Sequence, residues 1–423
     1  MKYKFSEIGA KLSGPSGIVE LMDDLGKALS HCNSNSMVMM GGGNPAHIPQ
    51  MQQVWRDRLS EILADADACD RILGNYDPPA GNLKFRNAIA DCLHGKFGWD
   101  LGPHNIAITC GGQTAFFLLF ALLAGKSAGQ NRSILLPLCP EYIGYADQGL
   151  NESALVARKP KIQELDSRRF KYSIDFDNLN IGPEIGAICV SRPTNPTGNV
   201  LTDLEIDRLA ALAEMHDIPL IIDNAYGSPF PNAVFTEIRP TWKSGMILSF
   251  SLSKLGLPGT RTGIVVADEE IATRITSMTG VVGLANPNFG QAIVTPLLES
   301  GELLRYSEEV IQPFYREKSQ LAQGLMEDHF GDHFPYGIHV SEGAFFLWLK
   351  FPELPIPTLE LYKRLKSRNV LIVPGEYFFY GLKPNDEDWA HRYQCIRVSF
   401  SQPEQSMSRG IATLAEELKE LHR

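Results

Sequence analysis

Paired cysteines and long apolar runs are both missing from this sequence of 423 residues. The seven cysteines are scattered, and no two of them form a Cys-x-x-Cys pair, so the sequence indicates neither a disulfide framework nor a metal site. Free thiols are typical of a reducing compartment, and we therefore expect a cytoplasmic protein. The longest apolar run, 115–124, is too short to span a bilayer, and the first residues lack the apolar core of a signal peptide. These absences argue against a secreted protein and against a membrane partner.

Positive charge is also in short supply. The chain has 39 lysines and arginines against 49 aspartates and glutamates, which gives a formal net charge of −10 at pH 7. This balance opposes binding to nucleic acid, whose phosphates attract basic surfaces. A small anionic substrate would need positive charge concentrated at its own site.

Length and the pattern of apolar runs predict the fold. A chain of 423 residues exceeds the size at which single cores stop growing, so we expect two domains. From residue 105 onward, short apolar runs alternate with helical stretches, which is typical of a parallel sheet with crossover helices. The predicted strands are 105–109, 134–138, 187–190, 219–222 and 247–250, and the predicted helices are 18–29, 48–63, 83–97 and 114–123. We predict an α/β fold, in which a large domain has a mostly parallel sheet flanked by helices and a ligand crevice at the carboxyl ends of its strands.

The last third of the chain has a different pattern. A charge-rich helical stretch, 301–328, leads into strand candidates at 345–349, 370–373 and 395–400 and a final helix at 404–421. This pattern predicts a smaller α+β domain.

The stretch Ile247–Arg261 brings unusual groups together. An apolar run typical of a buried strand leads into a polar loop with Ser251, Ser253, Lys254 and, seven residues later, Arg261. A lysine beside buried apolar sequence tends to lose its charge, and the neutral amine is the nucleophile that forms an imine with an aldehyde. Two hydroxyls and a guanidinium suit a phosphate dianion. The stretch therefore predicts a site for pyridoxal phosphate, an aldehyde that carries a phosphate; a solvated surface lysine is the alternative.

Polar residues also follow the neighbouring strands. Asp223 comes directly after an apolar strand, where it either caps the next turn or keeps a pyridine nitrogen protonated so that the ring can accept electrons. Tyr226 and Asn195 could each form a hydrogen bond with the ring's phenolic oxygen. The glycine turn at 110–113 opens a helix, so it is either an anion site or a plain tight turn.

Three more positions are ambiguous. In the strand 395–400, alternation places Arg397 opposite the apolar residues, either in solvent or as a bidentate clamp for a substrate carboxylate. The glycines at 41–43 precede Asn-Pro and form either a flexible turn or a close approach of the backbone to a ligand. Tyr76 lies in a turn-rich loop and by itself indicates no more than a surface anchor.

The order of these motifs is more specific than any one of them. Along the chain they are Asn195-Pro196-x-Gly198, Asp223-x-x-Tyr226, Ser251-x-Ser253-Lys254 with Arg261, and Arg397 in a late strand. With this series the chain resembles the class I and II aminotransferases, pyridoxal phosphate enzymes of fold type I. The resemblance covers nearly the whole chain, from Gly43 to the last helix. We expect 46–300 to form the large cofactor-binding domain, 301–423 the small domain, and 1–45 a segment that packs with the small domain and over the active site.

The resemblance implies a role for each residue. Lys254 would bind the cofactor's aldehyde and later act as the general base that moves a proton between the substrate's α-carbon and the cofactor. Asp223 would pair with the pyridinium nitrogen, and Tyr226 and Asn195 with the phenolic oxygen. Tyr142 would stack on the ring. The other residues implied to bind the cofactor, mostly at its phosphate, are Gly112, Gln113, Ser251, Ser253 and Arg261, with Tyr76 from the partner subunit.

A second set would hold the substrate. Arg397, helped by Asn195 and the backbone near Gly43, would bind its carboxylate, while Ile18 and Phe346 would line an apolar pocket for its side chain. The implied substrates are amino acids and 2-oxo acids, which react in two half-reactions at one site of a homodimer with shared active sites. For a branched donor and a small acceptor we expect modest discrimination, since one methyl group is worth only about 1 to 3 kcal/mol in such a pocket.

The chain departs from the family's motif at one position, and two alternative functions stay open. Many relatives have a hydroxyl residue at the position of Gly112, so one side-chain contact to the phosphate is missing here. The same scaffold could support C–S lysis or transfer from an aromatic or aminoadipate-like donor. It could also bind the cofactor without turnover, as in regulators that join this fold to a DNA-binding domain; the acidic charge and the lack of such a domain before residue 40 argue against that alternative.

Overall fold

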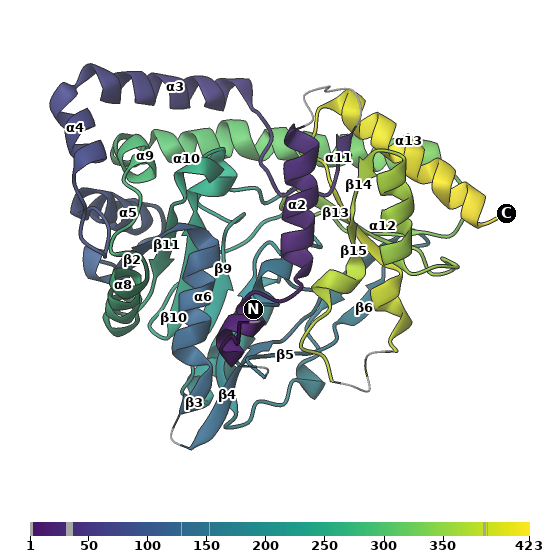
Figure 1. The fold of residues 1–423 in the computed structure, drawn as a ribbon, viewed down its shortest axis with the longest axis horizontal. Coiled ribbons are helices and arrows are strands. Elements are labelled where there is room, and N and C mark those ends of the chain that lie inside the picture. Colours follow the sequence, from purple (N-terminus) through teal and green to yellow (C-terminus); the bar gives the residue numbers. More distant parts are fainter. Residues whose placement is uncertain (1–2, 31–36, 128, 152, 384–385, 387) are drawn as a thin grey trace.

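Two main sheets and the helices around them make up the fold (Figure 1). The computed structural model describes residues 3–30, 37–127, 129–151, 153–383, 386 and 388–423. None of the helices in these ranges combines the length and the apolar character needed to cross a membrane.

The larger sheet has eight strands. In order across the sheet they are β2 (Ile106–Thr109), β11 (Gly263–Val266), β10 (Met246–Ser251), β9 (Leu220–Asp223), β8 (Ile185–Ser191), β4 (Gln130–Leu136) and β3 (Gly125–Ser127), with β5 (Leu155–Ala157) also beside β4. The pairs β10–β9, β9–β8, β8–β4 and β4–β5 are parallel, whereas β11 and β3 are antiparallel to their neighbours. The predicted mostly parallel α/β sheet is confirmed. Every residue of β2, β8, β10 and β11 is buried, which explains why these strands are continuous apolar runs.

Helices pack around this sheet. They are α3 (Pro49–Ala64), α4 (Ala66–Gly74), α5 (Leu83–Phe97), α6 (Gly111–Leu123), α7 (Asp203–Met215), α8 (Glu269–Gly283) and α9 (Phe289–Glu299). Both ends of α5 agree with the prediction. The Asn82 side chain caps the first N–H groups of the helix, and Gly98 ends it with a left-handed φ of 70°. α6 begins at Gly111, three residues before the predicted start, so the predicted glycine turn is the first turn of the helix.

The second sheet has six strands and takes them from two parts of the sequence. Its order is β15 (Val373–Pro374), β16 (Cys395–Ser399), β13 (Phe346–Lys350), β12 (Gly337–His339), β7 (Arg169–Ser173) and β6 (Lys161–Glu164). β6 and β7 lie within the range expected for the large domain, so the two sheets do not divide the sequence at one position. The predicted strand 370–373 is in fact two short strands, because β14 (Val370–Leu371) pairs with β1 (Val38–Met39) while β15 joins the second sheet.

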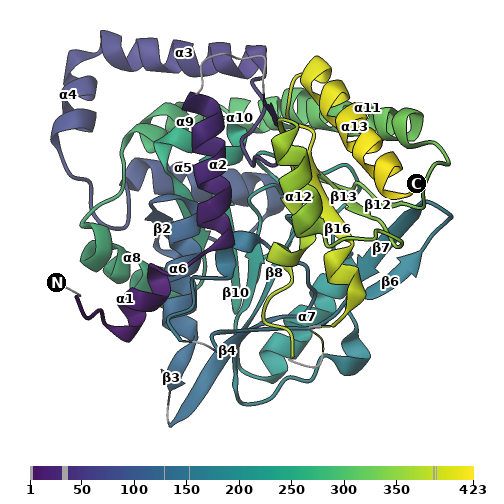
Figure 2. The ribbon, with the colours of Figure 1, turned by 45° about the vertical axis from the view of Figure 1, so that its right-hand side comes forward.

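Long helices accompany the second sheet (Figure 2). They are α11 (Gln312–Phe330), α12 (Thr358–Ser367) and α13 (Glu404–Leu421). The predicted helical stretch 301–328 consists of α10 (Glu302–Tyr306), a π-helical turn (Ser307–Ile311) and α11. The elements α11 and α13 lie side by side in Figures 1 and 2.

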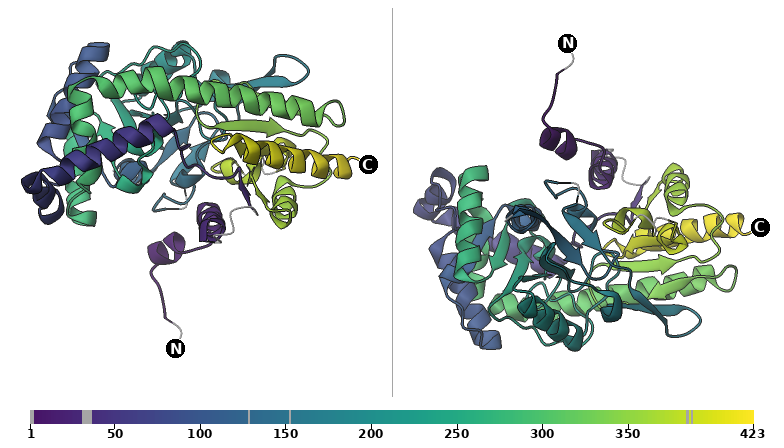
Figure 3. Two further views of the ribbon diagram at one scale, coloured as in Figure 1. Left: turned by 90° about the horizontal axis from the view of Figure 1, so that it is seen from above. Right: turned by 90° about the horizontal axis from the view of Figure 1, so that it is seen from below.

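The N-terminal segment contacts both halves of the molecule. It contains α1 (Glu7–Leu12) and α2 (Gly17–Ser30), and Figure 3 shows α1 projecting from the rest of the chain. The hydroxyl of Ser16 donates to Asp147 over 2.5 Å. On α2, the buried carboxylate of Asp24 accepts a hydrogen bond from Lys366 of α12 over 2.6 Å. The segment is therefore attached to each of the two sheet regions.

Candidate active site

The carboxyl ends of three neighbouring parallel strands form the floor of the site. Ser191 at the end of β8 is paired with Asp223 at the end of β9, and Asp223 is paired with Ser249 of β10. β10 continues into a 3₁₀ turn, Leu252–Leu255, which carries Lys254. Because parallel strands end at the same edge of a sheet, residues distant in the sequence meet here.

Lys254 lies inside this site. Its Nζ donates a hydrogen bond to the backbone oxygen of Gly43 over 2.7 Å and is 5.2 Å from the centre of the Tyr226 ring. Burial and the repulsion of Arg397 lower the pKa of Lys254 to about 8, against the attraction of Asp223. A substantial fraction of the amine is thus neutral in mildly basic solution, and the interpretation as a solvated surface lysine is wrong.

Asp223 is held by two donors. The hydroxyl of Tyr145 donates to its Oδ2, and the N–H of Ala225 donates to its Oδ1 over 3.0 Å. Burial raises the pKa of Asp223, while the hydrogen bonds from Tyr145 and Ala225 and the charge of Lys254 act in the opposite direction. The two interpretations of Asp223 are therefore compatible, since one oxygen caps the turn after β9 and the carboxylate as a whole faces a buried site.

Arg397 is buried, with 4% of its surface exposed. Its Nη1 donates to Oδ1 of Asn195 over 2.6 Å, and its Nη2 donates to the backbone oxygen of Gly41 over 2.8 Å. The guanidinium lies 4.1 Å from the centre of the Phe346 ring, and burial lowers the pKa of Arg397 to about 10. Within the described residues its Nε has no hydrogen-bond partner. The solvent-facing interpretation is wrong because every residue of β16 is buried.

The first turn of α6 faces Arg261 and Ser251. Gly111 has a φ of 83°, and a Cβ built on it would lie 2.2 Å from Nη2 of Arg261, so any other residue here would be strained and would displace that guanidinium. A Cβ on Gly112 would meet only the Cβ of Ser251, at 4.0 Å. The Oγ of Ser251 donates to the Oγ of Ser253 over 3.0 Å. Helix N–H groups, hydroxyls and a guanidinium thus surround one small space, which is the composition of an anion site.

The segment 141–145 forms one wall. The rings of Tyr142 and Tyr145 meet edge to face, with centres 5.1 Å apart and planes at 90°. The side chain of Gln113 donates to the backbone oxygen of Gly144 over 2.8 Å, so the side-chain amide is engaged with this wall and not with the anion space. The hydroxyl of Tyr380 donates to the backbone oxygen of Tyr142 over 2.7 Å and connects the wall to the second sheet region.

Sequence reasoning assigned no role to Glu141 or Tyr145. Glu141 is buried and accepts hydrogen bonds from the hydroxyl and the N–H of Ser191, over 2.6 and 3.0 Å. Burial raises the pKa of Glu141 to about 8. The signal in the sequence was a glutamate and two tyrosines directly after a buried strand, which only the fold brings beside Asp223.

Three predicted residues lie at the edges of this arrangement. Tyr76, after α4, is 81% exposed. Ile18 is partly buried on α2, whose Gly17 packs against Tyr377. Phe346 is fully buried beneath the Arg397 guanidinium, so its ring supports that group and does not line an open pocket.

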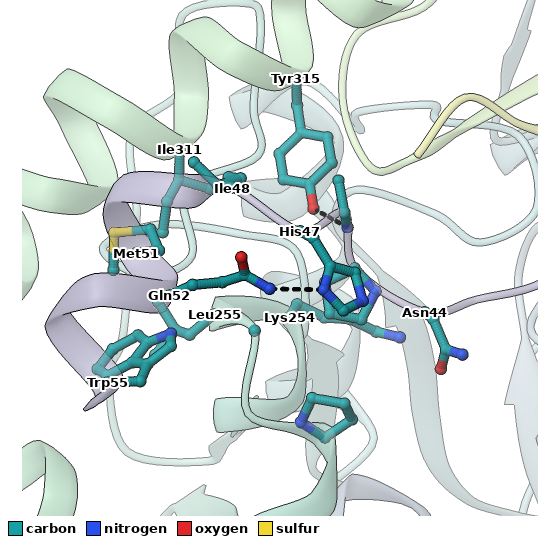
Figure 4. A pocket seen from close by; sticks show the side chains of 14 residues that line it. Asn44, His47, Ile48, Met51, Gln52, Trp55, Lys254, Leu255, Ile311 and Tyr315 are labelled. Atoms are coloured by element: carbon teal, nitrogen blue, oxygen red, sulfur yellow. Dashed lines mark hydrogen bonds between the residues drawn. The ribbon is translucent and has the colours of Figure 1, made fainter. Parts of the chain in front are cut away.

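A cavity of about 210 Å³ opens beside Lys254 (Figure 4). It lies between the loop that begins at Asn44, the first turns of α3 and the turn after Lys254. His47 and Gln52 are joined by a hydrogen bond of 2.5 Å at its mouth, and the hydroxyl of Tyr315 accepts from the N–H of Ala46 over 2.8 Å. Its lining contains no arginine and no acidic side chain, and across the described residues no group of three or more metal-ligating side chains is arranged to hold a metal ion.

Known proteins resemble this chain in both sequence and fold. The chain matches the family model for aminotransferases of class I and II over residues 50–414. It is 47% identical over 416 residues to the valine–pyruvate aminotransferase of Escherichia coli K12, and the match covers 98% of both chains. Among solved structures, a putative amino-acid aminotransferase from Psychrobacter arcticum matches with a TM-score of 0.95 at 44% identity, over 99% of both chains. The valine–pyruvate aminotransferase of Salmonella typhimurium matches with a TM-score of 0.87 at 46% identity, over 96% of this chain and 99% of that one.

Proposed function

This chain belongs to the class I and II aminotransferases, and from that membership we propose that it exchanges the amino group between L-valine and pyruvate. The products are 3-methyl-2-oxobutanoate and L-alanine, formed in two half-reactions at one site. The observation that supports the proposal is 47% identity over 98% of both chains to the valine–pyruvate aminotransferase of Escherichia coli K12.

The donor set fits pyridoxal phosphate. A Cβ on Gly112 would meet only one atom, so the backbone at the start of α6 is open to a phosphate that Arg261 and Ser251 also face. Asp223 offers a half-buried carboxylate, and Lys254 offers an amine whose pKa burial has lowered to about 8. When bound, the cofactor supplies an aldehyde for the amino group and a ring that accepts electrons from the substrate's α-carbon.

Lys254 has two tasks in this proposal. Its neutral amine would hold the cofactor through the aldehyde carbon, and it would be free whenever a substrate's amine occupies that carbon instead. In that state the amine would act as the general base that moves a proton between the substrate's α-carbon and the cofactor's C4′. The hydrogen bond to the backbone oxygen of Gly43 holds this amine inside the site, while burial and the repulsion of Arg397 keep its proton affinity low.

Other side chains set the electronic state of the ring. Asp223 would keep the pyridine nitrogen protonated, so that the ring can accept electrons. Tyr226 and the amide nitrogen of Asn195 would donate to the phenolic oxygen, and Tyr142 would stack on the ring. The remaining residues proposed to bind the cofactor are Gly112, Gln113, Ser251, Ser253 and Arg261.

Substrate recognition begins with the carboxylate. Arg397 has a buried guanidinium whose Nε lacks a partner among the described residues, and a buried cation of this kind suits a bidentate contact. Asn195 and the backbone at Gly43 complete the carboxylate site. The cavity beside Lys254 has no arginine in its lining, which favours an uncharged side chain such as that of valine over an acidic one.

The subunit arrangement, the domain boundaries and the cellular location are also proposals. Tyr76, at 81% exposure, is suited to reach the phosphate of a partner subunit in a homodimer with shared active sites. Residues 1–45 would pack over the site with Ile18 near the substrate, 46–300 would form the cofactor-binding domain apart from β6 and β7, and 301–423 would form the small domain together with those two strands. We place the protein in the cytoplasm, where its six described cysteines, all free thiols, would stay reduced.

A product assay tests the function. Purified protein loaded with pyridoxal phosphate is incubated with L-valine and pyruvate, and L-alanine and 3-methyl-2-oxobutanoate are quantified by chromatography. We expect equal amounts of both products. Turnover with L-phenylalanine or 2-aminoadipate but not with L-valine would assign a different amino donor. Release of a thiol and ammonia from a thioether amino acid would assign C–S lysis on the same scaffold. Tight cofactor binding without any turnover would favour the regulator alternative.

A further inference from the structure

Tyr145 is a buried residue that the proposed reaction does not use, and it touches two parts of the cofactor site. Its hydroxyl donates to Oδ2 of Asp223, and its ring stands at 90° to the ring of Tyr142. We propose that Tyr145 is a positioning residue that keeps Asp223 ionised and aimed at the cofactor's pyridine nitrogen. This inference rests on the proposed function, because it concerns how that cofactor is held.

Asp223 needs such a partner because its surroundings oppose its charge. Its neighbours on β8 and β10 are the uncharged Ser191 and Ser249, and the nearby Glu141 is a second carboxyl. The charge that acts in its favour is that of Lys254, which is lost whenever that amine is neutral. The hydrogen bond from Tyr145 is the largest influence that favours the ionised carboxylate, ahead of the N–H of the turn.

The hydroxyl of Tyr145 is fixed in the role of donor. The residue is fully buried, and its ring packs against Phe116 and Phe120 of α6, with ring centres 4.6 and 5.3 Å away. Burial and the nearby carboxylates raise the pKa of Tyr145 well above its ordinary value, so the phenol keeps its proton. A phenol that cannot ionise and cannot rotate away presents that proton to Asp223.

The same packing connects three parts of the cofactor site. α6 begins at the glycine turn that faces Arg261, and further along it packs against Tyr145. Tyr145 in turn contacts Tyr142 and Asp223. The anion space, the ring wall and the carboxylate are thereby set relative to one another by a single buried side chain.

The test is Tyr145→Phe, which removes the hydroxyl and keeps the ring. A charge-assisted hydrogen bond is lost, so we expect the dissociation constant of pyridoxal phosphate, measured on cofactor-free protein, to rise about tenfold or more. Asp223 then binds a proton more readily, and the cofactor's ring loses positive charge. The midpoint pH of the visible absorbance of the bound cofactor should therefore rise, whereas the KM for L-valine should stay within about twofold.

A matched control separates this effect from the loss of any buried hydroxyl. Tyr172 is also fully buried, and its hydroxyl is hydrogen-bonded to His391 and Trp348 in the second sheet region. We expect Tyr172→Phe to leave both the dissociation constant and the midpoint pH unchanged. Equal changes in the two variants would overturn the inference.

A double-mutant cycle with Asp223→Asn tests whether Tyr145 acts through the carboxylate. We expect Tyr145→Phe to add little to the effect of Asp223→Asn, because the charged acceptor is already gone. Full additivity would overturn the inference. If Tyr145→Phe cannot be purified, 3-fluorotyrosine at position 145 makes the hydroxyl a stronger donor and should lower the midpoint pH; no shift would overturn the inference. Failure of the unaltered protein to bind the cofactor would instead refute the proposed function.

Discussion

Arg397 and Asn195, 202 residues apart in the sequence, are joined by a hydrogen bond of 2.6 Å. The bond uses the amide oxygen of Asn195 and leaves its amide nitrogen to donate elsewhere. In the proposed complex that nitrogen faces the cofactor's phenolic oxygen, while Arg397 faces the substrate's carboxylate. One amide would thus connect the two ligands of the site.

The first prediction concerns the carboxylate clamp. Arg397→Lys should raise the KM for every amino acid and every 2-oxo acid tested, by about tenfold or more, because an ammonium cannot bind a carboxylate in two places. Arg274→Lys, a conservative change on the exposed surface of α8, is the matched control and should have no effect. A change in KM for one substrate alone would show that Arg397 recognises a side chain instead.

The second prediction concerns the pH dependence of Lys254. Only the neutral amine attacks an aldehyde, and burial and Arg397 lower the pKa of Lys254 to about 8 from its ordinary value of 10.5. The rate at which cofactor-free protein captures pyridoxal phosphate should therefore rise with pH and reach half its maximum near pH 8, as followed by visible absorbance. Arg397→Gln removes a repelling charge and should move the midpoint upward. A midpoint near 10.5 in the unaltered protein would contradict this assignment.

The third prediction uses two adjacent glycines with opposite surroundings. Gly111→Ala should weaken cofactor binding, because φ is 83° there and the new Cβ would lie 2.2 Å from Nη2 of Arg261. Gly112→Ser should instead tighten binding severalfold, since a Cβ there meets only the Cβ of Ser251 at 4.0 Å and the hydroxyl adds a donor to the phosphate. Equilibrium dialysis of pyridoxal phosphate measures both. Equal losses in the two variants would argue against a phosphate at this turn.

The fourth prediction tests the shared site. If Tyr76 serves the partner's site, a mixture of Tyr76→Phe and Lys254→Ala subunits contains dimers in which one of the two sites has both native residues. Refolding the two variants together should restore part of the turnover that each lacks alone. The absence of any recovery beyond that of the separately refolded variants would count against a site built from two subunits.

The sequence predicted the elements with a strong local signal. Buried parallel strands are continuous apolar runs, and the polar residues that end such runs, for example Asp223 at the end of β9, lie at the same edge of the sheet as predicted. It could not predict that β6 and β7 cross into the second sheet, because their pairing with β12 depends on residues far along the chain. It also left open whether Arg397 is solvated, since alternation within one strand cannot show that both faces of a sheet are covered.

Contacts between segments that are distant in the sequence could not be predicted from the sequence either. The hydrogen bond from Tyr145 to Asp223 joins residues 78 apart, and Tyr145 has no local pattern that distinguishes it from any other buried tyrosine. The predicted strand 370–373 divides between two sheets for the same reason, because its partners β1 and β16 lie elsewhere in the sequence. Local chemistry was readable from the sequence, whereas the supporting residues required the fold.

The visible spectrum of the protein loaded with pyridoxal phosphate tests the central claim most directly. L-valine is added without an acceptor, and pyruvate follows after the amino acid has been removed. The account predicts that L-valine abolishes the absorbance band of the lysine-bound cofactor and that pyruvate restores it, with Lys254→Ala showing no such band at any stage. A band that L-valine leaves unchanged while another amino acid abolishes it would contradict the proposed substrate, and a protein that never shows the band would contradict the cofactor itself.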